Sequence, residues 1–432
     1  MIPGAAVAMP SEARPARRTP DPAPNPGPPE ALYVHVPFCL SLCPYCDFVV
    51  VAGSAARGPR NRIGAFVAAL RRELELRAEA LDALWGPPGR GPRPALGSLY
   101  FGGGTPSLLP GEVLTDLIGL VRDRFGLTEG AEITLESNPG PEERGDARAL
   151  VAAGVTRLSF GAQAFDSATL RALGRRHEVG DVRDAVAAAR EAEVDSVSLD
   201  LLYDTPGATL AGWADALEAA LALEPDHLSL YALTLDDPDI EGLTGATGDH
   251  LPVTRGARRW RARARPRQDD DRAADMYRHA VDRLESAGFH GYEISNWARP
   301  GHESRHNLGY WTRRPHAAVG PGAHAFDGAT RRWNAARLDA YLAALTPDDG
   351  SPGHLPPGGD DPINALTAAA ESVILGLRLA RGIPVEAGER PPLAEHLGWA
   401  IGTGLLEPTP EDRLVLTARG RLLSNELFVR LI

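Results

Sequence analysis

The 432-residue chain contains no lysine, and it has only three cysteines and three methionines. Every basic residue other than histidine is therefore arginine, which we attribute to genome base composition. Asp and Glu total 57 against 45 Arg, so the formal net charge is −12. This negative charge disfavours sequence-independent electrostatic binding of nucleic acid, and we expect no nucleic-acid partner.

Long hydrophobic runs are also missing. No apolar segment reaches the roughly 18 to 20 residues that a membrane span needs, and the first thirty residues lack the basic start and apolar stretch of a signal peptide. Hydrophobic residues still make up 43% of the chain, enough for a substantial core. We therefore predict a cytoplasmic globular protein with one large domain and a smaller one.

The three cysteines all lie in the segment HVPFCLSLCPYCDF, as C-x3-C-x2-C. An odd number of closely spaced thiols does not suit a disulfide framework, and a reducing compartment disfavours disulfides. Structural zinc takes four ligands, so His35 would have to join Cys39, Cys43 and Cys46 in a zinc site. A four-iron cluster held by three thiolates instead keeps one iron without a protein ligand. The third alternative is three buried cysteines that act as small hydrophobes.

Short apolar runs alternate with amphipathic segments along the next 200 residues. Leu114, Leu117, Ile118 and Val121 follow helical spacing, and the segment from Leu210 follows it in part. The apolar runs predict buried strands at 32–36, 98–101, 132–136, 157–163, 196–203 and 227–233. Six strand-then-helix units predict an α/β fold whose parallel sheet curls into a full or partial barrel.

The remaining segments differ in composition. Residues 1–30 are Pro-rich and predict a disordered leader. The core is expected over 31–240, and 241–355 is expected to close the barrel and to include a polar stretch, RGARRWRARARPRQDDD, as a solvated loop. Residues 346–362 have the composition of a linker. Residues 356–432 predict a small α+β domain of winged-helix-like type with a structural role.

The cysteine spacing resembles that of the radical S-adenosylmethionine (SAM) enzymes. This resemblance implies a partial (β/α)6 barrel that carries a [4Fe-4S] cluster on Cys39, Cys43 and Cys46. The open iron would bind the amino and carboxyl groups of SAM, and an electron from the cluster would release a 5′-deoxyadenosyl radical, chemistry that belongs to the cofactor. Tyr45 lies where the family places an aromatic residue against the adenine.

Other polar residues at strand ends resemble the coproporphyrinogen-oxidase-like branch of this superfamily, from about Ala31 to the C-terminus. A glycine triplet in LYFGGGTPS would let backbone groups approach a ligand closely. The resemblance implies that SAM is bound by Tyr33, Tyr45, Gly103, Gly104, Thr105, Glu136, Gln163, Arg175 and Asp200.

Two functions compete within the branch. One is oxygen-independent coproporphyrinogen III oxidase, which decarboxylates propionate side chains. The other is a radical SAM heme chaperone, which binds heme and hands it to apoproteins. The oxidase carries a fourth cysteine two positions after the third, whereas this chain has Asp47 and Phe48 there, as the chaperones do. We expect the chaperone, leave open whether the chain is an enzyme, and keep a zinc-binding or interaction module as the alternative from another class.

Heme binding is further implied by a resemblance to the chaperones' H-N-x-x-Y-W motif, formed here by His306, Asn307, Tyr310 and Trp311. Imidazole is a usual axial ligand of heme iron, although such a histidine also fits a hydrogen-bonded core residue. His324 in AVGPGAHAF is a second candidate ligand. The resemblance also implies an electron donor to the cluster and heme-accepting apoproteins, membrane-associated cytochromes among them. It leaves the oligomeric state open.

One segment departs from the family. After Asp200 the family usually reads Tyr-Gly-Leu-Pro-Gly, whereas this chain has Asp204 and Thr205 in LLYDTPGAT. Asp204 brings a carboxylate and a β-carbon to a place where glycine tolerates positive φ. The sequence leaves the shape of this loop open.

Overall fold

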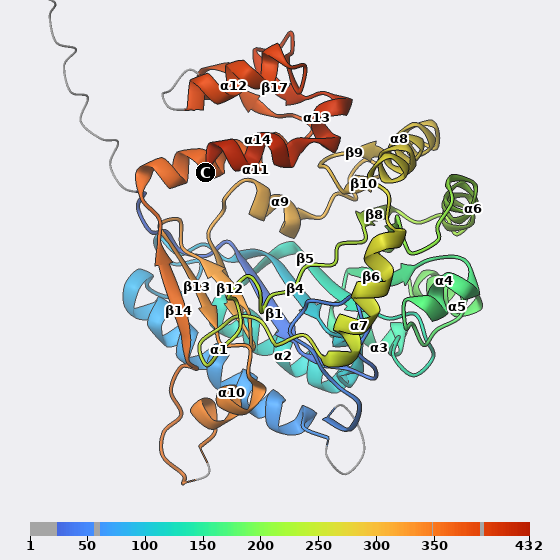
Figure 1. The fold of residues 1–432 in the computed structure, drawn as a ribbon. Coiled ribbons are helices and arrows are strands. Elements are labelled where there is room, and N and C mark those ends of the chain that lie inside the picture. The colour runs from blue at the N-terminus through green and yellow to red at the C-terminus, as the bar shows by residue number, and fades with distance from the viewer. Residues whose placement is uncertain (1–23, 56–60, 348, 389–392) are drawn as a thin grey trace, which may run out of the picture.

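The computed structural model describes residues 24–55, 61–347, 349–388 and 393–432. Its largest element is a twelve-stranded sheet in the order β14-β13-β12-β11-β1-β4-β5-β6-β7-β8-β10-β9 (Figure 1). Its strands are β1 (Ala31–Val36), β4 (Leu96–Gly103), β5 (Leu127–Ser137), β6 (Arg157–Gln163), β7 (Ser196–Tyr203), β8 (His227–Ala232), β9 (His290–Gly291), β10 (Asn296–Ala298), β11 (His316–Val319), β12 (His324–Phe326), β13 (Thr330–Asn334) and β14 (Gly358–Pro362).

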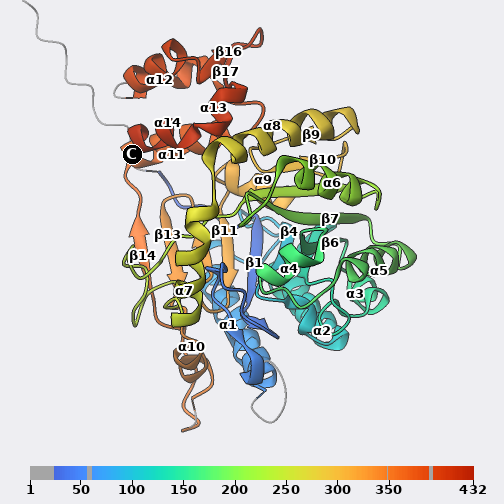
Figure 2. The ribbon, with the colours of Figure 1, turned by 45° about the vertical axis from the view of Figure 1, so that its right-hand side comes forward.

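The strands β1 and β4 to β8 are parallel, each paired with the next along the chain. Helices connect them on the outer side, as Figure 2 shows for α1, α2, α3 and α5. These connections are α1 (Ile63–Trp85), α2 (Gly111–Phe125), α3 (Ala147–Ala153), α4 (Ser167–Ala172), α5 (Val179–Glu191) and α6 (Leu210–Leu221). The predicted partial (β/α)6 barrel is confirmed, with a strand at each of the six expected places.

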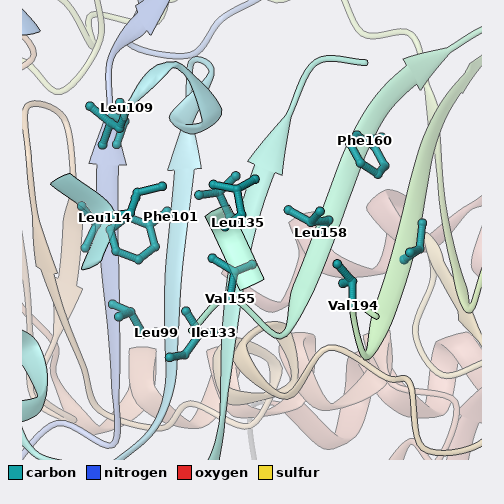
Figure 3. Packing of buried hydrophobic residues seen from close by; sticks show 14 of the residues in the cluster. Leu99, Phe101, Leu109, Leu114, Ile133, Leu135, Val155, Leu158, Phe160 and Val194 are labelled. Atoms are coloured by element: carbon teal, nitrogen blue, oxygen red, sulfur yellow. The ribbon is translucent and has the colours of Figure 1, made fainter. Parts of the chain in front are cut away.

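The apolar spacing explains how these elements pack. In α2, Leu114, Leu117, Ile118 and Val121 are all buried on one face. They join strand side chains in the main core, where Figure 3 shows Leu114 beside Phe101 of β4. Because β6 is buried along nearly its whole length, it contributes apolar groups to both of its faces.

The segment after β8 contains helices α7 (Arg255–Ala264), α8 (Asp270–Ser286), α9 (Arg305–Trp311) and α10 (Leu338–Leu345). The solvated loop expected at 255–271 is therefore wrong, because α7, the 3-10 turn η4 (Arg265–Arg267) and the start of α8 occupy most of it. Thr254 caps α7 by accepting a hydrogen bond from the Ala257 amide. Ala257, Arg261 and Ala264 recur at helical spacing and are buried, so one face packs on the barrel.

The linker expected at 346–362 also differs from the structure, because its last five residues form β14, which pairs antiparallel with β13. Gly358 and Gly359 allow this pairing: a β-carbon on either would collide with Trp333. A Gly-Gly pair that reads as a flexible segment thus lets one strand pass directly over a large side chain.

A small C-terminal domain follows, drawn in red above the barrel in Figure 1. It has its own apolar core, which includes Leu377, Leu397, Leu406 and Leu427, and a three-stranded sheet in the order β15-β17-β16. This agrees with the expected α+β class. Its elements are α11 (Ala365–Arg378), β15 (Ile383–Pro384), η5 (Val385–Gly388), α12 (Leu393–Gly402), β16 (Leu406–Pro408), β17 (Arg413–Leu416), α13 (Ala418–Leu422) and α14 (Ser424–Leu431).

The structure describes only the last part of the disordered leader that is expected over residues 1–30. Residues 1–23 lie outside the described residues. Nearer to β1, the amide of Gly27 donates to the Asp327 carbonyl (2.6 Å) and that of Glu30 donates to the Pro315 carbonyl (2.9 Å). Among the helices that the structure describes, none combines the length and apolarity needed to cross a membrane.

Candidate metal-cluster and cofactor site

The cysteine loop begins at the end of β2 (Phe38–Cys39), which pairs with β3 (Val51–Ala52). All three thiols are free and partly buried. The Thr105 hydroxyl lies 3.2 Å from Cys39 Sγ, and Arg175 Nη1 donates to Cys43 Sγ at 3.7 Å. Burial raises the pKa of the Cys39 thiol to about 12 and raises that of Cys46 as well. Binding of a metal centre would therefore release protons from these thiols.

The geometry of the thiols bears on the choice of metal. Within the described ranges, no three His, Cys, Asp or Glu side chains converge as a single ion would require. A four-iron cluster distributes its thiolates over different irons, so its ligands need not converge on one point. The donor set, three cysteines from one loop at the wall of a cavity, fits such a cluster better than mononuclear zinc.

The glycine segment lies directly on this loop. The Thr105 amide donates to the Phe38 carbonyl at 2.7 Å, and a β-carbon on Gly104 would come within 2.6 Å of that carbonyl oxygen. Gly103 has φ +113°, a conformation that favours glycine. The absence of side chains here fits a segment that supports a cluster loop and presents its backbone to a ligand.

Helix α7 holds the cysteine loop from the other side. The guanidinium of Arg261 donates to the carbonyls of Pro44 (3.1 Å), Tyr45 (3.1 Å) and Cys46 (3.0 Å), and also to that of Asp236. Its five N–H donors in a planar fork can serve several acceptors at once. Arg261 therefore fixes the backbone around the third cysteine, a contact that the Arg-rich sequence did not reveal.

A cavity of about 650 Å³, here called the barrel cavity, opens beside the loop. Seven of the nine residues expected to bind SAM line it together with all three cysteines. These residues are Tyr45, Gly103, Gly104, Glu136, Gln163, Arg175 and Asp200. Arg378 and Arg421 of the C-terminal domain line it too, so this domain contributes directly to the cavity wall.

Two carboxyl groups in the barrel cavity favour a cationic ligand. Tyr100 OH and the Gly103 amide donate to Glu136 at 2.7 and 3.0 Å, yet burial raises the pKa of Glu136 to about 7. Ser159 donates to Asp200 at 3.1 Å, and burial raises the pKa of Asp200 also. A positively charged ligand beside these groups would favour their ionised forms.

Arg175 occupies the centre of this polar network. Its Nη2 donates to Asn138 Oδ1 at 2.5 Å and to the Gly161 carbonyl at 2.7 Å. Gln163, at the end of β6, has φ +65°, which is uncommon for a residue with a side chain. The end of β6 is thus shaped around the cavity, in agreement with a binding role for Gln163.

Tyr33 and Thr105, the other two expected SAM residues, do not line the barrel cavity. Thr105 is buried behind the loop, against Cys39. Tyr33 stacks on Tyr100 with ring centroids 6.0 Å apart, and its hydroxyl lies 3.1 Å from His35 Nδ1. The structure places both in support of the cavity wall.

The expected heme motif lies on α9, whose first amides donate to Glu132 of β5. His306 is buried, with Nδ1 2.9 Å from the Ser98 hydroxyl and Nε2 2.8 Å from the Tyr310 hydroxyl. Burial lowers the pKa of His306 to about 3. Because both ring nitrogens are engaged, His306 could ligate iron only after losing one of these contacts.

The other motif residues point to different places. Asn307 lines the barrel cavity, whereas Tyr310 lines a second one. Trp311 packs under the Arg378 guanidinium, 4.3 Å from the ring centroid. The four motif residues therefore do not meet around one ligand.

The second cavity, here called the histidine cavity, measures about 400 Å³. His324, the second candidate heme ligand, lines it. The other lining residues are Tyr33, His35, Asp47, Phe48, Val49, Asp249, His250, Tyr310, His316 and Gly322. Asp47 and Phe48 line both cavities, so the end of the cysteine loop separates them.

Asp204 fixes the conformation of the loop that departs from the family pattern. It adopts φ +51° and is buried. Its carboxylate accepts hydrogen bonds from Arg272 Nε (2.9 Å) and from the Asp269 amide. The extra carboxylate thus joins the end of β7 to the start of α8.

Sequence reasoning missed several contributors. Tyr100 and Ser159 reach Glu136 and Asp200 from neighbouring positions on the same sheet face, and their alternation within apolar strands was the available signal. Arg261 carried a weaker signal, its helical spacing between Ala257 and Ala264.

Comparison with known proteins identifies the family. Residues 33–220 match the Radical SAM superfamily. Heme chaperone HemW of Mycobacterium tuberculosis (strain CDC 1551 / Oshkosh) is 39% identical over 93% of this chain and 95% of its own length. Heme chaperone HemW of Synechocystis sp. is 34% identical over 82% of this chain and 79% of its own.

A solved structure agrees on the fold. Coproporphyrinogen III oxidase (HemN) from Escherichia coli superposes with a TM-score of 0.73 over 94% of this chain and 91% of that one, at 23% identity. At this identity the likeness concerns the fold alone. From its sequence relatives, the chain belongs to the HemW family of the radical SAM superfamily.

Proposed function

We propose that this protein is a heme chaperone that binds heme and transfers it to apoproteins on a radical SAM scaffold. The observation that carries the proposal is the 39% identity to a heme chaperone over almost the whole of both chains. The cysteine loop and the polar barrel cavity support it, because the three cysteines and seven of the nine residues expected to bind SAM line one cavity.

In this proposal a [4Fe-4S] cluster is held by Cys39, Cys43 and Cys46, and SAM lies in the barrel cavity. When bound, the cluster supplies an electron that can cleave the SAM sulfonium. The protein's own part is to hold the ligands: Glu136 and Asp200 would take up the cationic groups of SAM, and Arg175 fixes the end of β6 through the Gly161 carbonyl. Tyr33 and Thr105 support the cavity wall from behind.

The proposed heme-chaperone function also implies partner proteins. We propose that the protein takes up heme in the cytoplasm and delivers it to heme-requiring apoproteins, among them membrane-associated cytochromes. A separate electron donor would reduce the cluster.

The test is heme transfer. Anaerobically reconstituted protein is loaded with one equivalent of heme and mixed with the apo form of a b-type cytochrome, and difference spectra follow both Soret bands. We expect stoichiometric transfer at a rate above that from free heme at the same concentration.

Two results would contradict the proposal. One is the absence of saturable heme binding. The other is decarboxylation of coproporphyrinogen III by cluster-replete protein given SAM and a reductant, which would assign the chain to the oxidase activity instead.

A further inference from the structure

A heme iron bound by histidine needs a ring nitrogen that is free to ligate. His35, His227 and His306 each use both ring nitrogens in hydrogen bonds. His177 is buried, with its Nε2 3.1 Å from the Ala162 carbonyl oxygen, which leaves only the nitrogen next to Cβ. These four histidines therefore do not offer an accessible ligand.

The histidine cavity contains a different arrangement, centred on Asp249. One carboxylate oxygen of Asp249 lies 2.9 Å from His250 Nδ1, and the other lies 2.9 Å from His324 Nε2. The two imidazole side chains are 30% and 45% exposed. Nothing among the described residues bonds to their remaining ring nitrogens, so each presents one nitrogen to a ligand.

The two imidazoles are not equivalent. In His250 the nitrogen bound to Asp249 is Nδ1, which leaves Nε2 at the far end of the ring. In His324 the order is reversed, and the remaining Nδ1 lies next to Cβ, where a flat macrocycle would collide with the backbone. His324 is also stacked on Trp333 at 6.0 Å. A carboxylate that accepts from one imidazole nitrogen orients the ring and makes its other nitrogen a stronger ligand.

The cavity walls suit a flat aromatic ligand. Tyr33 and Tyr310 contribute rings, and the Phe48 side chain, 63% exposed, lies at the boundary with the barrel cavity. A large exposed aromatic group beside a cavity is typical of a surface that an apolar ligand covers. Because His250 and His324 are themselves partly exposed, the cavity reaches the protein surface, from which a carried ligand can leave.

We propose that the histidine cavity is the heme site and that His250 Nε2 is the axial ligand, with Asp249 as the positioning residue. This inference rests on the proposed heme-chaperone function and names its binding site. His306 then affects heme binding only indirectly, because its Nε2 contacts the hydroxyl of Tyr310 in the wall of the histidine cavity.

The test is a heme titration of anaerobically reconstituted protein, followed by Soret absorbance. We compare wild type with His250→Gly, Asp249→Asn and His306→Ala, and use His354→Ala, at an exposed histidine outside both cavities, as the matched control. We expect saturable one-to-one binding in the wild type and in the control. His250→Gly should bind at least tenfold more weakly with a shifted Soret maximum, and added imidazole should restore the wild-type maximum.

The positioning variants separate direct from indirect roles. Asp249→Asn should weaken binding about tenfold while keeping an imidazole-type spectrum. His306→Ala should keep the wild-type Soret maximum with a smaller loss of affinity. If His250→Gly binds as the wild type does while His306→Ala loses the Soret shift, the site is wrong and the chaperone function stands. If the wild type does not bind heme saturably, both are wrong.

Discussion

The two cavities are built differently although they share the end of the cysteine loop. In the barrel cavity the key polar groups are already bonded to one another, as Glu136 is to Tyr100 and Arg175 is to Asn138. In the histidine cavity, His250 and His324 are partly exposed and each keeps one ring nitrogen open. A preorganised interior suits cofactors that stay, whereas an exposed imidazole beside aromatic walls suits a cargo that is taken up and released. The comparison therefore predicts that the cluster can be lost without loss of heme binding, and heme binding without loss of the cluster.

The largest expected effect is on the cluster. Cys43→Ser should reduce iron and acid-labile sulfide to background, because two cysteines cannot hold the cluster, while heme titration still reaches one equivalent. Ser41→Ala in the same loop is the control and should keep full iron content. Loss of heme binding in Cys43→Ser would contradict the separation of the cavities.

The second-largest effect is expected for Arg261→Ala, which should destabilise the cysteine loop beside the barrel cavity. It leaves the carbonyls of Pro44, Tyr45 and Cys46 without their donor, which we expect to lower the free energy of unfolding by about 3 kcal/mol and to speed cluster loss in air. Denaturant unfolding and iron content measure the two effects. Arg263→Ala, exposed on the same helix, is the matched control, and equal behaviour of the two variants would refute this role.

Glu136 makes stability depend on pH. Its pKa is raised from 4.5 to about 7 by burial, so between these values the folded protein keeps a proton that the unfolded chain has lost. The free energy of unfolding should therefore fall as pH rises from 4.5 through 7, by on the order of 3 kcal/mol, and then level off. Glu136→Gln should flatten this slope in the cofactor-free protein, whereas exposed Glu112→Gln should not. An unchanged slope in Glu136→Gln would contradict the assignment.

Ser98→Ala gives the smallest effect. It removes one buried hydrogen bond to His306 and should cost about 1 kcal/mol of stability, measured by thermal unfolding. Because Ser98 lies outside the histidine cavity, heme affinity should stay within twofold of wild type. A loss of affinity as large as that of His250→Gly would mean that α9 binds heme directly.

The sequence predicted the barrel well and the second cavity poorly. Successive parallel strands end at one edge of the sheet, so polar residues such as Glu136 and Asp200 could be placed together from strand positions alone. The cysteine loop was equally visible, because its ligands are local in sequence.

The missed parts depend on contacts between distant segments. His250 lies in a polar stretch with no regular pattern, and it meets His324 only through Asp249. Helix α7 was hidden because its arginines dominate the composition, although Ala257 and Ala264 mark its buried face. Strand β14 was missed because its two glycines resemble a flexible linker in the sequence, whereas in the structure they make room for Trp333.

The most direct test is an experimental structure of the anaerobically reconstituted protein with heme. The account predicts a cluster on Cys39, Cys43 and Cys46 beside the barrel cavity, and heme in the histidine cavity with its iron on His250 Nε2. Heme inside the barrel cavity, or iron on His306, would contradict it.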